Sequence, residues 1–316
     1  MRIVILLPIL LTACPDTGKD SADTGNGSQG ETGDDTSSHT GGGTVESIVV
    51  APDSLTLDTT RTAGAFTATA VWSDGTESDI SGDCVWTAAD PNVVFLDMAG
   101  SAHGISPGET VATCTYSGLT DDATVTVGPF ALALAGEVVI NELLADPAVG
   151  ADPNQDGTAD ATQDEFVELV NAAGYSVDLE GLTLWDSQQD SARHTFGPNS
   201  TLKPGEAVVV FGGGMPALGV DRCNAYPAWN DDNSLQLGLG MNNEGDTLTL
   251  RATDGTVVGS LTFDGSIEDA SIVLNPEISG TDYTHHSYVT DSVGAYSPCT
   301  LSTGAAFPTV SERLAL

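Results

Sequence analysis

The sequence predicts an all-β protein with two β-sandwiches in tandem behind a disordered N-terminal tether. Short runs in which apolar and polar residues alternate, such as Phe66–Trp72, recur along the chain and are typical of half-buried strands. Turn-forming residues such as Ser73–Gly75 separate these runs, and few segments repeat apolar residues at helical spacing. Gly, Thr, Ser, Val and Ala are abundant, which favours short strands over helices.

The charge of the chain is strongly negative. It carries 45 Asp and Glu residues against 8 Lys and Arg, a formal net charge of −37. Proteins that bind the phosphate backbone of nucleic acids need a basic surface, so this composition argues against nucleic acid as a partner. Solubility and resistance to association explain the acidity without any ligand, and capture of cations is the alternative.

The N-terminus resembles the signal of a bacterial lipoprotein. Met1 and Arg2 supply a positive start, and Ile3–Leu11 is an apolar run too short to span a bilayer. Small residues then precede Cys14, which is the pattern of the lipobox. The resemblance implies removal of residues 1–13 and acylation of Cys14 by several chains, which anchors a protein stably where one chain would not. An ordinary secretory signal that carries a cysteine is the alternative.

Residues 14–44 are predicted to form a disordered acidic tether between the lipid and the folded part. The segment is rich in Gly, Ser, Thr and Asp and has almost no large apolar side chain, so it cannot bury enough surface to fold. We therefore expect a protein of the bacterial cell envelope, held to the membrane by its lipid anchor. The outer membrane is favoured over the inner one, and exposure at the cell surface stays open.

Residues 45–128 are predicted to form the first sandwich. Within them Trp86–Val93, His103–Gly108 and Thr110–Thr113 together resemble a group 2 bacterial Ig-like domain. The resemblance covers nearly the whole segment and implies an Ig-like sandwich with Trp86 in its core. Such domains act as spacers or adhesive units, and no residue pattern in this one indicates chemistry.

Cys84 and Cys114 depart from that family pattern. In an exported protein, two cysteines of one domain are expected to form a disulfide. By the loop-entropy argument such a bond contributes about 3 kcal/mol to stability. A zinc site is not expected, because two cysteines without nearby partner ligands do not complete a closed shell.

Residues 136–300 are predicted to form the second sandwich, built from roughly eight to ten short strands. Ala207–Phe211 is a continuous apolar run, as expected of a strand that is buried on both faces. Residues 301–316 are predicted to be a C-terminal tail, which is frayed from Ala305 to Leu316.

Six segments of this half resemble, in order, a lamin tail domain. They are Val139–Leu143, Asp164–Asn171, Val177–Leu184, Arg193–Phe196, Leu202–Glu206 and Asn243–Asp246. The resemblance covers residues 137–266 and implies an Ig-type sandwich that binds or scaffolds rather than catalyses, without identifying a ligand. Cys223 and Cys299 also lie in this half, and we expect them to pair and fasten the less well matched end onto the domain.

An acidic loop separates two predicted strands of this half. Residues 152–157 match the opening of a calcium-binding loop, in which alternate oxygen side chains converge and a glycine permits a sharp turn. Gln163 stands where a bidentate glutamate is usual, although neighbouring carboxylates can replace it, because calcium accepts six or more oxygens. The predicted calcium ligands are Asp152, Asn154, Asp156, Asp160 and Asp164. A solvated acidic loop is the alternative.

Candidate catalytic residues are few. Glu142 and Glu168 fall on predicted strands, and paired carboxylates can act as acid and base, but a structural, hydrogen-bonded role is favoured because both belong to the family motif. His285 and His286 lack a third ligand at metal-binding spacing. The chain has no Gly-x-Ser-x-Gly, and Gly212–Gly214 is not followed by the Gly-Lys-Ser/Thr of a phosphate loop. We therefore predict that the protein has no catalytic residues and is not an enzyme.

The sequence as a whole predicts a lipid-anchored envelope protein whose second domain binds or displays. The expected partner is an envelope or extracellular protein or glycan, and calcium is the cofactor under consideration. Two alternatives stay open. One is a purely structural envelope component without a specific ligand, and the other is a hydrolase that uses the acidic cluster.

Overall fold

The computed structural model of the chain describes residues 43–228, 238–265 and 269–314. The predicted signal peptide, Cys14 and nearly all of the tether lie outside the described residues. Strands dominate the described part, so the all-β prediction is confirmed. The strands of the first half are β1 (Val45–Ala51), β2 (Ser54–Leu57), β3 (Ala63–Ala65), β4 (Thr67–Trp72), β5 (Glu77–Asp79), β6 (Val85–Ala88), β7 (Val94–Leu96), β8 (Ser101–Gly104), β9 (Gly108–Tyr116) and β10 (Leu119–Val127).

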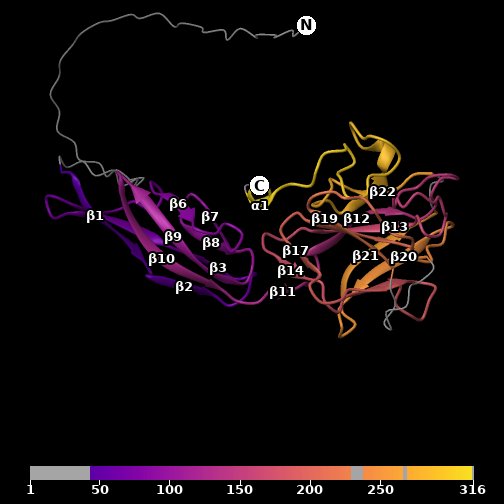
Figure 1. Cartoon of the computed structure of the whole chain (residues 1–316), viewed down its shortest axis with the longest axis horizontal. Coiled ribbons are helices and arrows are strands. Elements are labelled where there is room, and N and C mark those ends of the chain that lie inside the picture. Colours follow the sequence, from indigo (N-terminus) through magenta and orange to yellow (C-terminus); the bar gives the residue numbers. More distant parts are fainter. Residues whose placement is uncertain (1–42, 229–237, 266–268, 315–316) are drawn as a thin grey trace, which may run out of the picture. The chain divides into compact units, whose positions relative to one another are not determined.

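The first half forms three small sheets around one apolar core. Their strand orders are β1-β4-β5, β2-β10-β9-β6 and β3-β8-β7, and the pairing of β2 with β10 is parallel (Figure 1). Trp86 is buried and stacks on Phe66, with 5.9 Å between the ring centroids. Cys84 and Cys114 form the predicted disulfide inside this core.

The second half contains more strands than predicted. Thirteen are present in its described residues, because several are two-residue bridges. They are β11 (Ala131–Leu132), β12 (Val138–Leu144), β13 (Phe166–Asn171), β14 (Val177–Asp178), β15 (Thr183–Asp186), β16 (His194–Thr195), β17 (Thr201–Leu202), β18 (Ala207–Phe211), β19 (Cys223–Pro227), β20 (Asp246–Arg251), β21 (Val257–Phe263), β22 (Ile272–Asn275) and β23 (Asp282–His285). A 3₁₀ turn η1 (His286–Tyr288) and a short helix α1 (Val310–Leu314) follow.

Two larger sheets face each other in this half. One has six strands in the order β19-β18-β13-β12-β22-β23, and the other has four in the order β16-β15-β20-β21 (Figure 1). A smaller sheet, β11-β14-β17, completes the set, and β18 pairs with β19 in parallel. The main apolar core lies between the two larger sheets and includes Leu143, Leu169, Leu184, Leu250 and Leu261.

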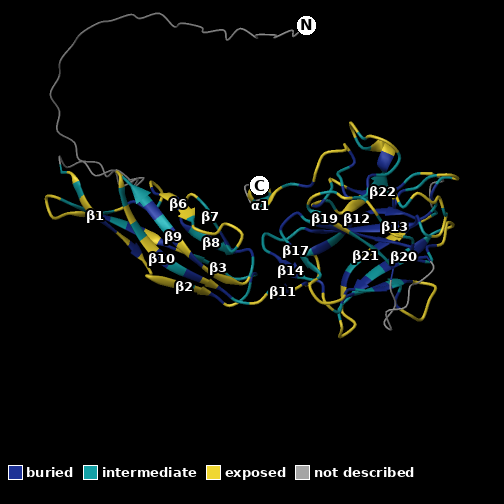
Figure 2. Ribbon diagram, in the orientation of Figure 1, coloured by how far each residue is buried: buried dark blue, intermediate teal, exposed yellow. Residues whose placement is uncertain are grey.

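The centre of the six-stranded sheet is buried on both faces. Every residue of β13 and β18 is buried, which confirms the prediction for Ala207–Phe211 (Figure 2). On the face away from the main core, Phe166 and Phe211 pack with Cys299, and Val170 packs with Phe307. The chain beyond β21 therefore covers this second face, and the predicted disulfide Cys223–Cys299 ties it to β19.

The prediction of a frayed tail over residues 305–316 is wrong for part of its length, because Phe307 is buried and only 2% exposed. Ser302, just before this segment, is buried as well. Burial of the aromatic ring of Phe307 against the sheet removes apolar surface from water, and this favours an ordered segment over a frayed one. Beyond it, Thr309 caps α1 through its bonds with Glu312. No helix in the three described ranges is long and apolar enough to cross a membrane.

Candidate functional site

The acidic loop lies between β12 and β13, and its carboxylates point at the backbone of the same loop. Asp164 Oδ1 accepts a hydrogen bond from Asn154 N at 3.2 Å, and Oδ2 accepts one from Asp160 N at 2.8 Å. Asp152 Oδ2 accepts one from Gly157 N at 3.0 Å. Backbone N–H groups thus balance part of the negative charge in this loop.

Asp164 is the buried centre of the loop. Its side chain is fully buried, and burial is the main cause that raises its pKa above the ordinary value. Repulsion from Asp152 and Asp156 adds to the rise, while the backbone bonds act against it. A pKa raised by neighbouring carboxylates indicates charge that the loop does not fully neutralise.

The glycine run Gly212–Gly214 follows β18 and packs against this loop. A Cβ atom on Gly212 would lie 2.0 Å from Thr162 O, and one on Gly214 would lie 2.4 Å from Asp156 Oδ2. Gly214 also has a φ of +75°, which side chains other than glycine rarely adopt. The absence of side chains on these glycines lets the acidic loop lie close to the end of β18. This close packing, rather than phosphate binding, accounts for the glycine run.

The predicted calcium ligands agree with calcium in type but only partly in arrangement. Asp152 Oδ1 is buried and has no hydrogen-bond partner, whereas both carboxylate oxygens of Asp164 and Oδ1 of Asp160 accept backbone N–H bonds. In the described part of the chain, no group of three or more His, Cys, Asp or Glu side chains is placed to hold a metal ion. Asp152 Oδ1 is therefore the buried oxygen among these ligand candidates that has no hydrogen-bond donor.

Glu142 and Glu168 are directly opposite each other on β12 and β13, and both are fully buried. Glu142 Oε1 accepts bonds from Ser271 Oγ at 2.5 Å and Ser297 N at 2.8 Å, and Oε2 accepts one from Ser297 Oγ at 2.6 Å. Burial raises the pKa of Glu142 to about 7. Burial, followed by repulsion from Glu142, raises the pKa of Glu168 well above its ordinary value.

Glu168 and its neighbours hold the late part of the chain in the same way. Glu168 Oε2 accepts a bond from Cys299 N at 2.7 Å, and Oε1 accepts one from Asn141 Nδ2 at 2.9 Å. Asn141 Oδ1 in turn accepts one from Ile278 N at 2.9 Å. A third carboxylate, Glu277, accepts bonds from the backbone and hydroxyl of Ser302. These contacts agree with the hydrogen-bonded structural role that the sequence favours for Glu142 and Glu168.

Glu165 binds the backbone of a distant segment, a role that the sequence does not reveal. It is buried, and its Oε2 accepts bonds from Leu239 N at 3.1 Å and Gly240 N at 3.2 Å. Burial raises its pKa to about 8, against the opposing effect of these bonds and of Arg193. The sequence offers no signal for this contact, because the donors lie more than seventy positions away along the chain.

The adjacent histidines differ in their surroundings. His285 lies beside Tyr288, with 4.8 Å between ring centroids, whereas His286 is fully buried. Burial lowers the pKa of His286, so the ring stays neutral at physiological pH. Adjacent positions thus do not place both rings at one site.

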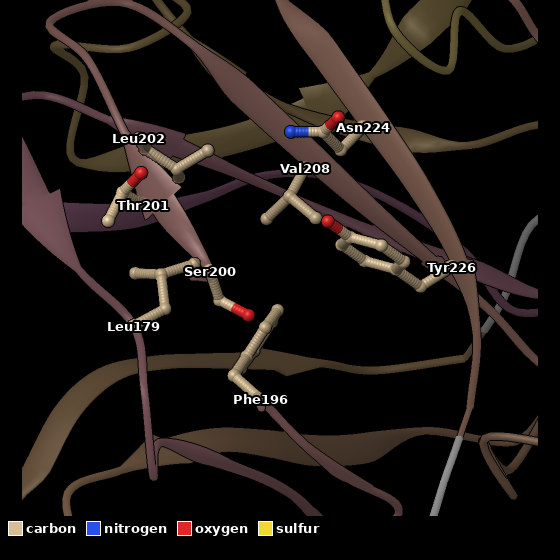
Figure 3. A pocket seen from close by; sticks show the side chains of 8 residues that line it. All are labelled: Leu179, Phe196, Ser200, Thr201, Leu202, Val208, Asn224 and Tyr226. Atoms are coloured by element: carbon tan, nitrogen blue, oxygen red, sulfur yellow. The ribbon is translucent and has the colours of Figure 1, made fainter. Parts of the chain in front are cut away.

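Two of the hollows among the described residues of the second half are small for a ligand site. Figure 3 shows the first, in which Phe196, Val208 and Tyr226 converge with Ser200 and Asn224 and leave no volume for a water molecule. The second has a volume of about 150 Å³ and lies between β12 and β21. Neither contains one of the predicted site residues.

Residues 133–265 match the family model of the lamin tail domain. This match covers less than half of the chain, so it shows a likeness, and the second half is called the lamin tail domain below after that likeness. The protein Ice-binding protein 1 of Shewanella frigidimarina (strain NCIMB 400) is 28% identical over 169 residues, which are 54% of this chain. The match covers 17% of that protein, so the chain spans about a sixth of the relative's length.

Solved structures give weaker matches. Domains 5–6 of the S-layer protein SbsC are 12% identical with a TM-score of 0.24, over 70% of this chain and 97% of that one. A DUF4876 family protein from Bacteroides thetaiotaomicron VPI-5482 is 9% identical with a TM-score of 0.23, over 60% and 53% of the two chains. TM-scores this low support no conclusion about function.

Proposed function

We propose that this protein is anchored through Cys14 in the bacterial cell envelope, in the outer membrane, and presents its lamin tail domain as a binding or display module. Its partner is an envelope or extracellular protein or glycan, and its role is adhesion or scaffolding. The observation that carries the proposal is the lamin tail domain in a chain whose first residues resemble a lipoprotein signal. The likeness to Ice-binding protein 1, a protein named for binding, supports the proposal.

The buried carboxylates support a binding role over a hydrolytic one. Glu142 and Glu168 accept hydrogen bonds from Ser271, Ser297 and Cys299, and neither side chain is exposed. A general acid or base must reach the proton that it transfers. These two carboxylates are enclosed by the protein's own donors.

The anchor is tested by fractionating cells that express the wild type, Cys14→Ser or the tether control Thr36→Ala. The wild type and Thr36→Ala are expected in the outer-membrane fraction, and Cys14→Ser is expected to be released from it, because acyl chains supply the membrane affinity. Protease added to intact cells then tests exposure at the surface. A wild type that fractionates with soluble proteins contradicts the proposal.

A structural component without a specific ligand is the alternative to a binding module. Envelope extract passed over the immobilised protein distinguishes them. Enrichment of one protein or glycan supports the binding module, and an eluate that equals the eluate from a column without protein supports the structural component.

We also propose that calcium stabilises the acidic loop through Asp152, Asn154 and Asp156, with Asp160 and Asp164 beside them. The supporting observation is the buried Oδ1 of Asp152, which has no hydrogen-bond partner. A ligand that binds only the native state raises the free energy of unfolding, and with it the melting midpoint. At a free ligand concentration of one hundred times the dissociation constant, the gain in free energy is about 2.7 kcal/mol.

Melting curves with calcium and with a chelator test this second proposal. The wild type and the exposed control Asp190→Asn are expected to melt higher with calcium, and Asp152→Asn to lose most of that rise. Equal midpoints in calcium and chelator for the wild type contradict it.

A further inference from the structure

The outer face of the four-stranded sheet in the lamin tail domain presents an unusual set of side chains. The inward residues of β15, β20 and β21, among them Leu184, Leu250 and Leu261, are buried in the main core. The outward positions of the same strands are partly or fully exposed. They are Thr183 and Trp185 on β15, Thr247, Thr249 and Arg251 on β20, and Val257, Ser260 and Thr262 on β21.

Trp185 and Arg251 form the centre of this face, which we call the Trp–Arg face. Trp185 is opposite Thr249 and Arg251 is opposite Thr183, so the two large side chains are diagonal neighbours. The Cζ atom of Arg251 lies 4.7 Å from the centroid of the Trp185 ring. Trp185 Nε1 donates to Thr183 Oγ1 at 2.8 Å, and Arg251 Nε donates to Thr249 Oγ1 at 2.9 Å. Both side chains are thus held in place before any ligand arrives.

The charge of the Trp–Arg face is opposite to that of the protein. The chain has 45 acidic residues and 8 basic ones, and Arg61, Arg193 and Arg222 are each paired with a carboxylate. Arg251 forms no ion pair within the described ranges, and the outward positions of β15, β20 and β21 carry no carboxylate. A guanidinium fork is therefore available to a carboxylate from outside the protein.

The first sandwich carries a comparable threonine-rich face, which shows what threonine alone signifies. The outward positions of β9 and β10 include Thr113, Thr124 and Thr126, together with Asp122 and Glu109. Threonine is a favoured strand residue, so such a face needs no ligand to explain it. What distinguishes the Trp–Arg face is the stacked aromatic and cation in place of the carboxylates.

We propose that the Trp–Arg face binds an acidic polysaccharide, whose sugar rings carry carboxylate groups. The part of the Trp185 indole that Arg251 leaves uncovered offers an apolar surface to the C–H face of a sugar ring. The guanidinium of Arg251 offers two parallel N–H donors to a sugar carboxylate. The hydroxyls of Thr247 and Thr262, 2.8 Å apart, can exchange hydrogen bonds with the sugar hydroxyls. The protein's overall negative charge is screened beyond about 8 Å at physiological ionic strength, so the local charge decides contact.

This inference rests on the proposed function and names the glycan and the surface that binds it. The test is cosedimentation of the purified protein with polygalacturonate coupled covalently to agarose beads, without added divalent cations, beside neutral xylan coupled to the same beads. The wild type is expected to bind polygalacturonate and not xylan. Trp185→Ala and Arg251→Ala are each expected to weaken binding about tenfold or more, because each removes more than about 1.4 kcal/mol of contact.

Matched controls separate binding from folding. Tyr288→Ala removes another exposed aromatic ring and Lys203→Ala removes another cation, and both are expected to bind as the wild type does. Trp185→Phe and Arg251→Lys keep an aromatic ring and a cation on the face, so each is expected to lose less binding than the alanine variant at the same position, and melting curves check that each variant is folded. Unaffected binding in folded Trp185→Ala and Arg251→Ala, binding to xylan alone, or no binding to either polymer overturns the inference. The envelope proposal is judged separately, by fractionation and surface proteolysis, and stands or falls on those results.

Discussion

The core of the first sandwich is apolar, whereas the lamin tail domain buries carboxylates and amides among its apolar residues. Among the described residues of the first half, the buried polar side chains are Thr60 and Thr110. The lamin tail half buries Asn141, Glu142 and Glu168 at the centre of its largest sheet. A sheet that is buried on one face needs only alternating apolar residues. When a sheet is buried on both faces, the chain segment that covers the second face has backbone N–H groups that need buried hydrogen-bond acceptors.

The largest expected effect comes from removing the disulfides one at a time. Loss of Cys223–Cys299 by double substitution to alanine is expected to lower the free energy of unfolding of the lamin tail domain by about 4.5 kcal/mol. The corresponding loss of Cys84–Cys114 is expected to cost the first sandwich about 3.5 kcal/mol, slightly more than the general figure of about 3 kcal/mol given above, because its loop has a sequence separation of 30. The longer loop, with a sequence separation of 76 against 30, gives the larger value.

Chemical denaturation of the two double variants measures these losses. A smaller loss of stability in the Cys223–Cys299 variant than in the Cys84–Cys114 variant would contradict this order. It would mean that the buried hydrogen bonds hold the late segment of the second half without help from the disulfide.

The substitution Glu142→Ala tests whether the buried polar contacts stabilise the domain. It leaves Ser297 N and two serine hydroxyls without their acceptor, and each unsatisfied buried donor costs about 1–3 kcal/mol. We expect the lamin tail domain to lose about 3 kcal/mol and the first sandwich to be unchanged. Denaturation of Glu142→Ala beside the exposed control Glu180→Ala measures it. Equal stability of the two variants would break the comparison.

The two halves are also expected to differ in their response to pH. The pKa of Glu142 is raised to about 7 and that of Glu165 to about 8, so the native state holds protons that the unfolded state releases above its own pKa near 4.5. Their contribution to stability is present below that value and is lost as the pH rises through 7 and 8. The loss is up to about 1.4 kcal/mol per pH unit for each group.

Histidine gives the opposite trend in a lower range. Burial lowers the pKa of His194 to about 4, so its contribution is lost only as the pH falls below 6.5. In the first sandwich, Asp79 and Asp97 have lowered pKa values and titrate in acid. Raising the pH from 6.5 to 8 should therefore lower the melting midpoint of the lamin tail domain and leave that of the first sandwich unchanged. A flat profile for both halves contradicts this assignment.

The sequence predicts the elements of both sandwiches because alternation, turns and continuous apolar runs are local signals. Ala207–Phe211 shows this well, since five consecutive apolar residues predict burial on both faces, and both faces are buried. Both disulfides also follow from position within each half. The signal for each feature lies within a few residues of the feature itself.

The partners of the buried carboxylates could not be predicted, because they lie far along the chain. Ser297 is 155 positions from Glu142, and Cys299 is 131 positions from Glu168. Gly212–Gly214 lacks the residues that would complete a phosphate loop, so the sequence gives it no role. Its close approach to Thr162 and Asp156 follows only from the pairing of β18 with β13. Phe307 is one aromatic residue in a polar segment, so its burial leaves no pattern to detect.

The hydrogen bonds to Glu142 and Glu168 have a practical consequence for anyone who expresses part of this protein. A fragment cut at the family boundaries, residues 133–265, keeps both carboxylates and discards Ser271, Ser297 and Cys299, which supply their donors. It also exposes the apolar face that carries Phe166 and Phe211. We therefore expect a stable fragment of this chain to extend beyond the region that matches the family model, at least as far as Phe307.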